Sequence, residues 1–173
     1  GTPDDTLLRY LRAFGPASVG DASAWSRLTG LREPFERLRP RLRTFRDERG
    51  RELFDVDDAP ILTGEEPAPV RFLPDYDNAL LSHQDRSRVV PELDWPELGD
   101  NITAPVFLVD GFVAGIWKPV GKGRETGIGL RPMVGIDASD RPEIEAAASA
   151  LLAMIEPEAD PGRVTWWRED EGP

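Results

Sequence analysis

The chain has no cysteine, and among its 173 residues histidine and glutamine each occur once, as His83 and Gln84. The absence of cysteine excludes disulfides, zinc–thiolate sites and cysteine nucleophiles, and a single histidine excludes a multi-histidine metal site. There is also no apolar run of about eighteen residues, and no basic N-terminal region followed by an apolar stretch. The sequence therefore predicts a cytoplasmic protein with no membrane span, secretory signal, metal ion or other cofactor.

Positive charge is scarce as well, because 21 basic residues face 32 acidic ones and leave a net charge of −11. This acidity argues against DNA binding over the whole surface, since Lys and Arg that neutralise phosphates supply most nonspecific affinity. The charge is unevenly spread. Residues 1–60 hold eleven residues of each sign, and residues 24–51 hold nine arginines against four acids. A polyanion is expected to bind on this arginine-rich stretch.

Residues 1–60 show the order of elements of a winged helix. Thr2 caps a first helix that ends at Gly15-Pro16, and Ser18 with Asp21 has the spacing of a capping box for a second helix. A third helix follows in LREPFERLRP, and a hairpin is expected from RLRTF and RELFDV. Three helices and a hairpin predict a winged-helix unit; a generic small α+β unit is the alternative.

Residues 68–173 predict a β-rich domain of short strands with a packed C-terminal helix. In PVFLVDGFVAGIW, Asp110-Gly111 favours a two-residue hairpin turn, and Gly115 indicates a bulge or a close backbone approach. A helix is expected over residues 140–155 and a last strand in GRVTWWRED. The fold class predicted for the chain is therefore α+β, with the winged-helix unit followed by a small β-barrel-like domain.

The sole histidine lies in LLSHQDRSRVV, close to Asp85. An oriented histidine can act as a general base, but no Gly-x-Ser-x-Gly elbow and no cysteine accompanies it. A structural or DNA-facing role of His83 is therefore favoured, while a hydrolase using His83, Asp85 and Asp77 would require these groups to converge on a pocket. Arg86 and Arg88 are spaced to share a strand face, where they would reach phosphates or pair with acids.

Four segments together resemble the bacterial winged helix DNA-binding domain-containing protein family: LRYLRAFGPAS, AWSRLTGL, VRFLPDYDNALLSHQDRSRVV and VFLVDGFVAGIWK. The likeness extends over most of the chain and corresponds to the C-terminal two-thirds of the family protein. The family includes DNA glycosylases that excise alkylated bases and unhook interstrand crosslinks. The resemblance implies consecutive winged helices and a β-barrel-like domain that form a concave surface for double-stranded DNA.

The glycosylases of that family carry a Gln-x-Gln or Gln-x-Asp motif near their start, which positions water for N-glycosidic hydrolysis. Here Gln84 is the only glutamine and Arg86 occupies the third position, so the motif is missing and no catalytic residue is assigned. The resemblance thus implies the DNA-binding or scaffold portion of a glycosylase-like repair protein, whose N-terminal catalytic winged-helix region is absent from this chain. LLSHQDRSRVV would shape the DNA-facing surface from within the β-rich half.

Eight basic side chains are expected to face the DNA, five of them from the arginine-rich stretch, while the Asp110-Gly111 tip is expected to reach a groove. The eight are Arg32, Arg37, Arg39, Arg43, Arg46, His83, Arg86 and Arg88. The alternative function, motivated by the isoelectric point of about 4.6, is a non-enzymatic acidic module for protein interaction or regulation that keeps the fold.

Overall fold

The structure, a computed structural model, describes residues 2–91 and 104–167. Over these ranges, five α-helices and two sheets make up the α+β fold that the sequence predicts. None of the helices there is long and apolar enough to cross a membrane. The chain divides into two compact units, unit 1 with residues 1–66 and 78–86 and unit 2 with residues 67–77 and 87–173.

Unit 1 begins with three helices, whose starts follow from the capping residues. The hydroxyls of Thr2 and Ser18 accept the backbone N–H of Asp5 and Asp21, and each aspartate accepts the N–H of its cap in return. Both predicted caps are therefore confirmed, the first with Asp5 completing a capping box. The helices are α1 (Pro3–Phe14), α2 (Val19–Ser26) and α3 (Arg32–Leu38), and the 3₁₀ turn η1 (Arg39–Arg41) continues from α3.

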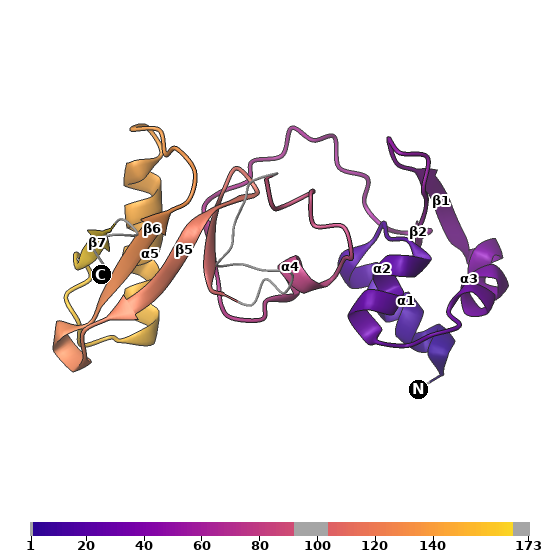
Figure 1. The fold of residues 1–173 in the computed structure, drawn as a ribbon, viewed down its shortest axis with the longest axis horizontal. Helices are drawn as coiled ribbons and strands as arrows, with labels where there is room; N and C mark the ends of the chain where they lie inside the picture. The colour runs from indigo at the N-terminus through magenta and orange to yellow at the C-terminus, as the bar shows by residue number, and fades with distance from the viewer. Residues whose placement is uncertain (1, 92–103, 168–173) are drawn as a thin grey trace. The chain divides into compact units, whose positions relative to one another are not determined.

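An antiparallel hairpin follows, formed by β1 (Leu42–Arg46) and β2 (Glu52–Val56). Gly50 in its turn has a φ of 78°, which glycine adopts without a steric penalty. In Figure 1 the three helices lie beside this hairpin. The elements predicted for residues 1–60, three helices and a hairpin, are present in the predicted order.

The core of unit 1 is apolar, and α3 contributes Phe35 and Leu38 to it. Phe35 of α3 and Phe54 of β2 are almost fully buried, with ring centroids 4.8 Å apart. Burial of each such side chain stabilises the unit by about 1.5–3 kcal/mol relative to exposure. The buried members of this core are Leu7, Tyr10, Leu11, Ala17, Ala22, Leu31, Phe35, Leu38, Phe54 and Val56.

Residues 78–86 belong to unit 1, although the sequence places them in the β-rich half. They begin with the short helix α4 (Asn78–Leu81). Polar contacts explain their position: the Tyr10 hydroxyl donates to the carbonyl of Ser82 at 2.7 Å, and the Trp25 indole donates to Asn78 Oδ1 at 3.2 Å. The chain thus leaves unit 1 for one strand and returns to it, which no local pattern signals.

Unit 2 contains a five-stranded sheet in the order β3-β4-β5-β6-β7, with antiparallel neighbours except for the parallel pair β6 and β7. The expected barrel-like closure is not found, because β3 and β7 form the two edges of an open sheet of the described strands. β7 runs parallel to β6 because a helix carries the chain back between them. The strands are β3 (Arg71–Leu73), β4 (Val106–Val109), β5 (Phe112–Val120), β6 (Gly127–Pro132) and β7 (Val164–Trp166).

That helix is α5 (Arg141–Ile155), which agrees with the prediction over residues 140–155. It packs along the sheet of unit 2 (Figure 1) and contacts β3, β6 and β7. Its inward residues Ile144, Ala148 and Leu152 have no exposed surface and form one core with the sheet. The sheet therefore gains its stability by covering one face with α5 rather than by closing on itself.

The β4–β5 hairpin has the predicted turn. Asp110 and Gly111 have φ values of 49° and 79°, the left-handed pair that a tight hairpin requires. Gly115 shows both features expected of it: the register shifts opposite it between Phe107 and Leu108, and a Cβ there would lie 2.3 Å from the Arg131 carbonyl oxygen. Phe112 beside the turn is 46% exposed.

Candidate nucleic-acid interface

The carboxylate of Asp21, at the start of α2, is buried in unit 1 and accepts hydrogen bonds from two separate segments of the chain. It accepts the N–H of Ser18 at 2.8 Å and the N–H of Gln84 at 2.9 Å. Burial alone would raise the pKa of Asp21, but hydrogen bonds from Ser18 and Gln84, with the charge of His83, hold that pKa below its usual value. Although only 3% of Asp21 is exposed, it is therefore ionised and anchors residues 78–86 to α2.

His83 belongs to the same polar cluster. Its Nδ1 lies 2.8 Å from the Ser82 hydroxyl oxygen. The residues around it form a loop, so the strand face predicted for Arg86 and Arg88 is not present. Arg86 Nε instead donates to the Leu80 carbonyl at 3.0 Å and thereby stabilises the bend that follows α4. Arg86 belongs to unit 1 and Arg88 to unit 2, so the two residues do not share one element.

Asp85, the partner considered for His83, accepts hydrogen bonds from two guanidinium groups of the β1–β2 turn. Arg49 Nη1 lies 3.2 Å and Arg51 Nη2 2.8 Å from Asp85 Oδ2. Asp77, the third member of the hydrolase hypothesis, belongs to unit 2. Within the described ranges no group of three or more His, Asp or Glu could hold a metal ion. These two contacts make Asp85 part of an ion-pair network with the β1–β2 turn.

Two of the arginines predicted to face DNA are bound to carboxylates of unit 1. Arg37 donates a hydrogen bond to each carboxylate oxygen of Asp4, at 3.0 and 2.6 Å, and this contact lowers the pKa of Asp4. Arg39 lies between Glu36 at 2.7 Å and Glu52 at 2.9 Å, and these carboxylates raise the pKa of Arg39. A phosphate would have to compete with these bidentate partners.

Arg43 is also paired with a carboxylate of unit 1. Its side chain pairs with the Asp57 carboxylate at 3.5 Å and donates to the Asp57 carbonyl oxygen. It lies on the hairpin opposite the buried Asp55. Sequence reasoning places Arg43 in the interface because the stretch is rich in arginine, but that pattern does not indicate that Asp4, Glu52 and Asp57 would pair with arginines of this stretch.

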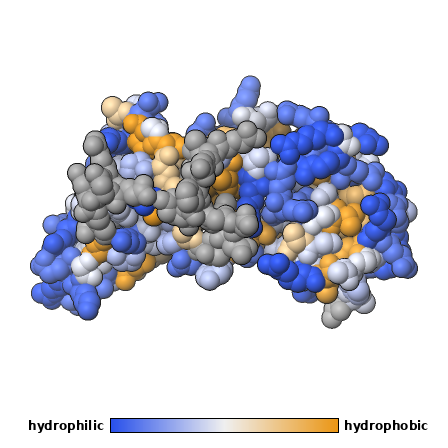
Figure 2. Space-filling view, in the orientation of Figure 1, coloured by the Kyte–Doolittle hydropathy of each residue, from blue (hydrophilic) through white to orange (hydrophobic). Residues whose placement is uncertain are grey.

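Arg27, just after α2, is one open member of the arginine-rich stretch, and Arg32, Arg41 and Arg46 are three more. All four are exposed, and none makes an ion pair with any residue the structure describes. Arg46 donates to the Gly50 carbonyl, a neutral partner, at 3.1 Å. Arg41 was not among the predicted contacts, although it follows Pro40 within the same stretch. Hydrophilic residues cover most of the face of unit 1 seen in Figure 2.

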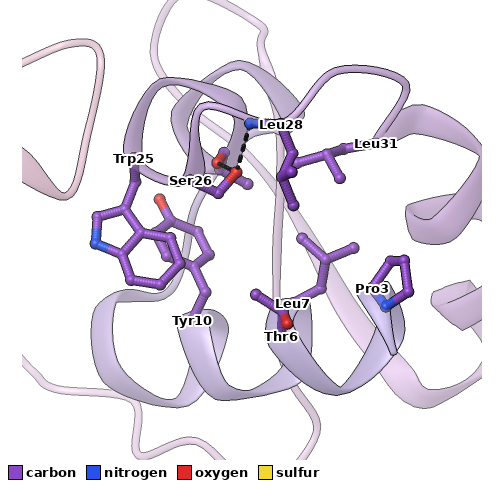
Figure 3. Close-up of a pocket in the computed structure, with 9 residues that line it drawn as sticks. Pro3, Thr6, Leu7, Tyr10, Trp25, Ser26, Leu28 and Leu31 are labelled. Carbon is purple, nitrogen blue, oxygen red and sulfur yellow. Dashed lines mark hydrogen bonds between the residues drawn. The ribbon is translucent and has the colours of Figure 1, made fainter. Parts of the chain in front are cut away.

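Unit 1 also has a shallow apolar pocket between α1, α2 and the turn that precedes α3 (Figure 3). Tyr10 and Trp25 meet in its wall with ring centroids 5.0 Å apart. No Asp, Glu, Lys, Arg or His lines it, and the hydroxyl of its tyrosine, Tyr10, donates to the Ser82 carbonyl at 2.7 Å. Its lining residues are Pro3, Thr6, Leu7, Tyr10, Ala22, Trp25, Ser26, Leu28 and Leu31.

A family model and a solved structure are similar to this chain. A family model described as DNA glycosylase AlkZ-like matches residues 2–154. No curated protein matches the chain. Among solved structures, the DNA glycosylase AlkZ of Streptomyces sahachiroi is similar, with a TM-score of 0.65 and 20% identity over 96% of this chain and 45% of that one. This likeness is one of fold, and the chain spans less than half the length of that relative.

Proposed function

The chain belongs to the AlkZ-like DNA glycosylase family, and we propose that it forms the DNA-binding and scaffold portion of a glycosylase that repairs alkylated or crosslinked bases in double-stranded DNA. The family match over residues 2–154 is the observation that carries this proposal. Unit 1 would act as a winged helix, which its helices and hairpin support. Unit 2 would support that DNA-binding surface.

We infer that the residues that hydrolyse the glycosidic bond in the family lie outside the part of the similar glycosylase that this chain matches. The chain contains no Gln-x-Gln or Gln-x-Asp sequence. Its match covers 45% of the similar glycosylase, which leaves room for such residues in that relative. Gln84, the only glutamine, serves unit 1 through its backbone N–H.

Arg32, Arg41 and Arg46 are proposed as the main phosphate contacts, because each presents an exposed charge with no ion pair among the described residues. Arg37, Arg39 and Arg43, expected from the sequence as contacts, are proposed to act mainly within unit 1. A guanidinium group already bound to a carboxylate gains less from a phosphate than an open one does. The Asp110-Gly111 tip, with Phe112 beside it, remains a candidate for groove contact.

Binding to a short fluorescent duplex, with and without an abasic site, tests the proposal. The affinity is expected to fall with salt, with a slope near −0.9 per phosphate contact in a plot of log K against log salt. Replacing Arg32, Arg41 and Arg46 together by Gln should flatten this slope by about 2 to 3. The matched triple change at Arg37, Arg39 and Arg43 should leave the slope nearly unchanged while lowering the stability of unit 1.

One observation favours a second function. Arginine pairing in unit 1 and the net charge of −11 leave little free positive charge, as in an acidic protein-interaction module. Such a module would not bind duplex DNA even at about 10 mM salt, where electrostatic attraction is screened least. Equal effects of the two triple changes on DNA affinity would likewise argue against the proposed interface.

A further inference from the structure

The turn between β1 and β2 holds two arginines in a fixed arrangement. Asp47 Oδ1 accepts the N–H groups of Arg49 at 3.0 Å and Arg51 at 2.7 Å, and the N–H of Gly50 donates to the Asp47 carbonyl at 2.9 Å. The other oxygen of Asp47 binds Arg51 Nε at 2.5 Å. The turn therefore sets the backbone of both arginines and the direction of the Arg51 side chain.

Both guanidinium groups converge on a single oxygen, Oδ2 of Asp85, at 3.2 Å from Arg49 and 2.8 Å from Arg51. The Arg49 side chain is 64% exposed and that of Asp85 only 19%. Carboxylate and phosphate oxygens accept the same guanidinium donors in similar geometry. The pair of arginines thus has the donor arrangement of an oxyanion site, with a carboxylate of the same chain in it.

Hydrogen bonds of the neighbouring backbone, which do not involve the side chain of Asp85, hold Asp85 in this position. The N–H of the preceding residue, Gln84, is bound by Asp21, and the carbonyl of Ser82 is bound by the Tyr10 hydroxyl. A group held in this way competes at a high effective concentration with any anion from solution. Loss of the Asp85 charge would free the site while the backbone of the segment keeps its other attachments.

We propose that Arg49 and Arg51 form a phosphodiester-binding site on the β1–β2 turn, and that Asp85 occupies this site as an internal anion until a phosphate of DNA replaces it. The inference extends the DNA-binding role proposed above and rests on it for the identity of the ligand. Arg51 keeps its pair with Asp47 when Asp85 leaves. Arg49, whose side-chain hydrogen bond and ion pair are with Asp85, supplies the larger share of the new phosphate contact.

The test compares the full chain with its Asp85→Asn variant in binding to an unmodified fluorescent duplex across a salt series. The variant should bind about threefold tighter or more at low salt, with a slope steeper by about 0.9 for each arginine that gains a phosphate. Glu48→Gln is the matched control, because Glu48 is an exposed acid of the same turn without an ion pair among the described side chains. It removes the same charge and should leave the slope unchanged.

Arg49→Gln provides a second variant that does not disturb the segment around Asp85. Alone, it should lower DNA affinity only modestly, because Asp85 already competes with the phosphate for this arginine, and combined with Asp85→Asn it should abolish the gain. An Asp85→Asn variant that binds no tighter than Glu48→Gln, or a gain that persists when Arg49→Gln is added to Asp85→Asn, would overturn the proposal.

The outcomes separate this inference from the proposed function. Binding by the unaltered chain with no gain in Asp85→Asn would leave the DNA-binding role standing and refute the internal anion. Binding by Asp85→Asn alone would support the internal anion and refute binding by the unaltered chain. An absence of binding in both proteins would refute both proposals, because the released arginines would then have no affinity for phosphodiesters.

Discussion

Units 1 and 2 hold distant parts of the chain together by different forces. In unit 1, residues 78–86 are attached by hydrogen bonds and ion pairs to Tyr10, Asp21 and the β1–β2 turn. In unit 2, the edge strands β3 and β7 join the sheet through backbone ladders, and α5 covers that sheet with apolar side chains. Polar attachment fixes where a segment lies, whereas apolar burial supplies most of the stability.

The first and the second part of the chain also differ in net charge. Residues 1–60 are neutral, while residues 61–173 hold ten basic and 21 acidic residues. The arginines of unit 1 serve two purposes, because some bind carboxylates of the same unit and others remain open to solvent. A basic composition is therefore a poor guide to a DNA-binding surface until the partners of each arginine are known.

The largest effects should come from emptying the two cores. Phe35→Ala in unit 1 and Phe107→Ala in unit 2 each remove a fully buried ring and should cost about 3–5 kcal/mol. Each loss should be confined to its own unit, because each ring packs within its own core. Hydrogen exchange followed peptide by peptide measures this. Faster exchange in both units of either variant would show that the two cores unfold as one body.

A smaller pair of effects should separate two buried acids of unit 1. Asp21→Asn keeps only one of the two oxygens that accept from Ser18 and Gln84 and should cost about 1–3 kcal/mol at pH 7. Asp55→Asn should be neutral or stabilising, because burial raises the pKa of Asp55 and its charged form is unfavourable. Urea unfolding of both variants provides the comparison. A loss of stability in Asp55→Asn as large as that in Asp21→Asn would contradict it.

The two acids should also respond oppositely to pH. The lowered pKa of Asp21 contributes stability that is present above the unfolded value of about 3.9 and is lost as pH falls through the folded pKa. The raised pKa of Asp55 imposes a cost that is complete above its folded pKa and disappears as pH falls below about 3.9. Each variant should therefore approach the unaltered chain in strongly acidic solution, from opposite sides.

Local signals in the sequence predict much of this molecule. The capping residues Thr2 and Ser18, the dipeptide Asp110-Gly111 and the apolar spacing of α5 each act within a few residues, and each predicted element is present. The open sheet differs from the expected barrel because closure depends on the pairing of edge strands far apart in sequence. No local pattern reports such pairing.

The candidate interface was less predictable for the same reason. Arg37 meets Asp4 across 33 residues, and Arg51 meets Asp85 across 34. A sequence shows the number of arginines but not which of them a distant acid will neutralise. The return of residues 78–86 to unit 1 likewise depends on hydrogen bonds whose partners, Tyr10 and Asp21, have no distinguishing pattern.

The smallest effects concern two hydrogen bonds that attach residues 78–86 to α1 and α2. The buried bond should contribute more to stability than the exposed one. Tyr10→Phe removes the donor to the buried Ser82 carbonyl and should cost about 1–2 kcal/mol, because an unpaired buried acceptor loses water as well as its partner. Asn78→Ala removes only the exposed acceptor of the Trp25 indole, which water can replace, and should cost less than about 0.5 kcal/mol. Urea midpoints at constant m-value would measure both changes. Equal costs would mean that the segment is released as a whole when either contact is lost, and its hold on unit 1, including the position of Asp85, would then be cooperative rather than a sum of separate hydrogen bonds.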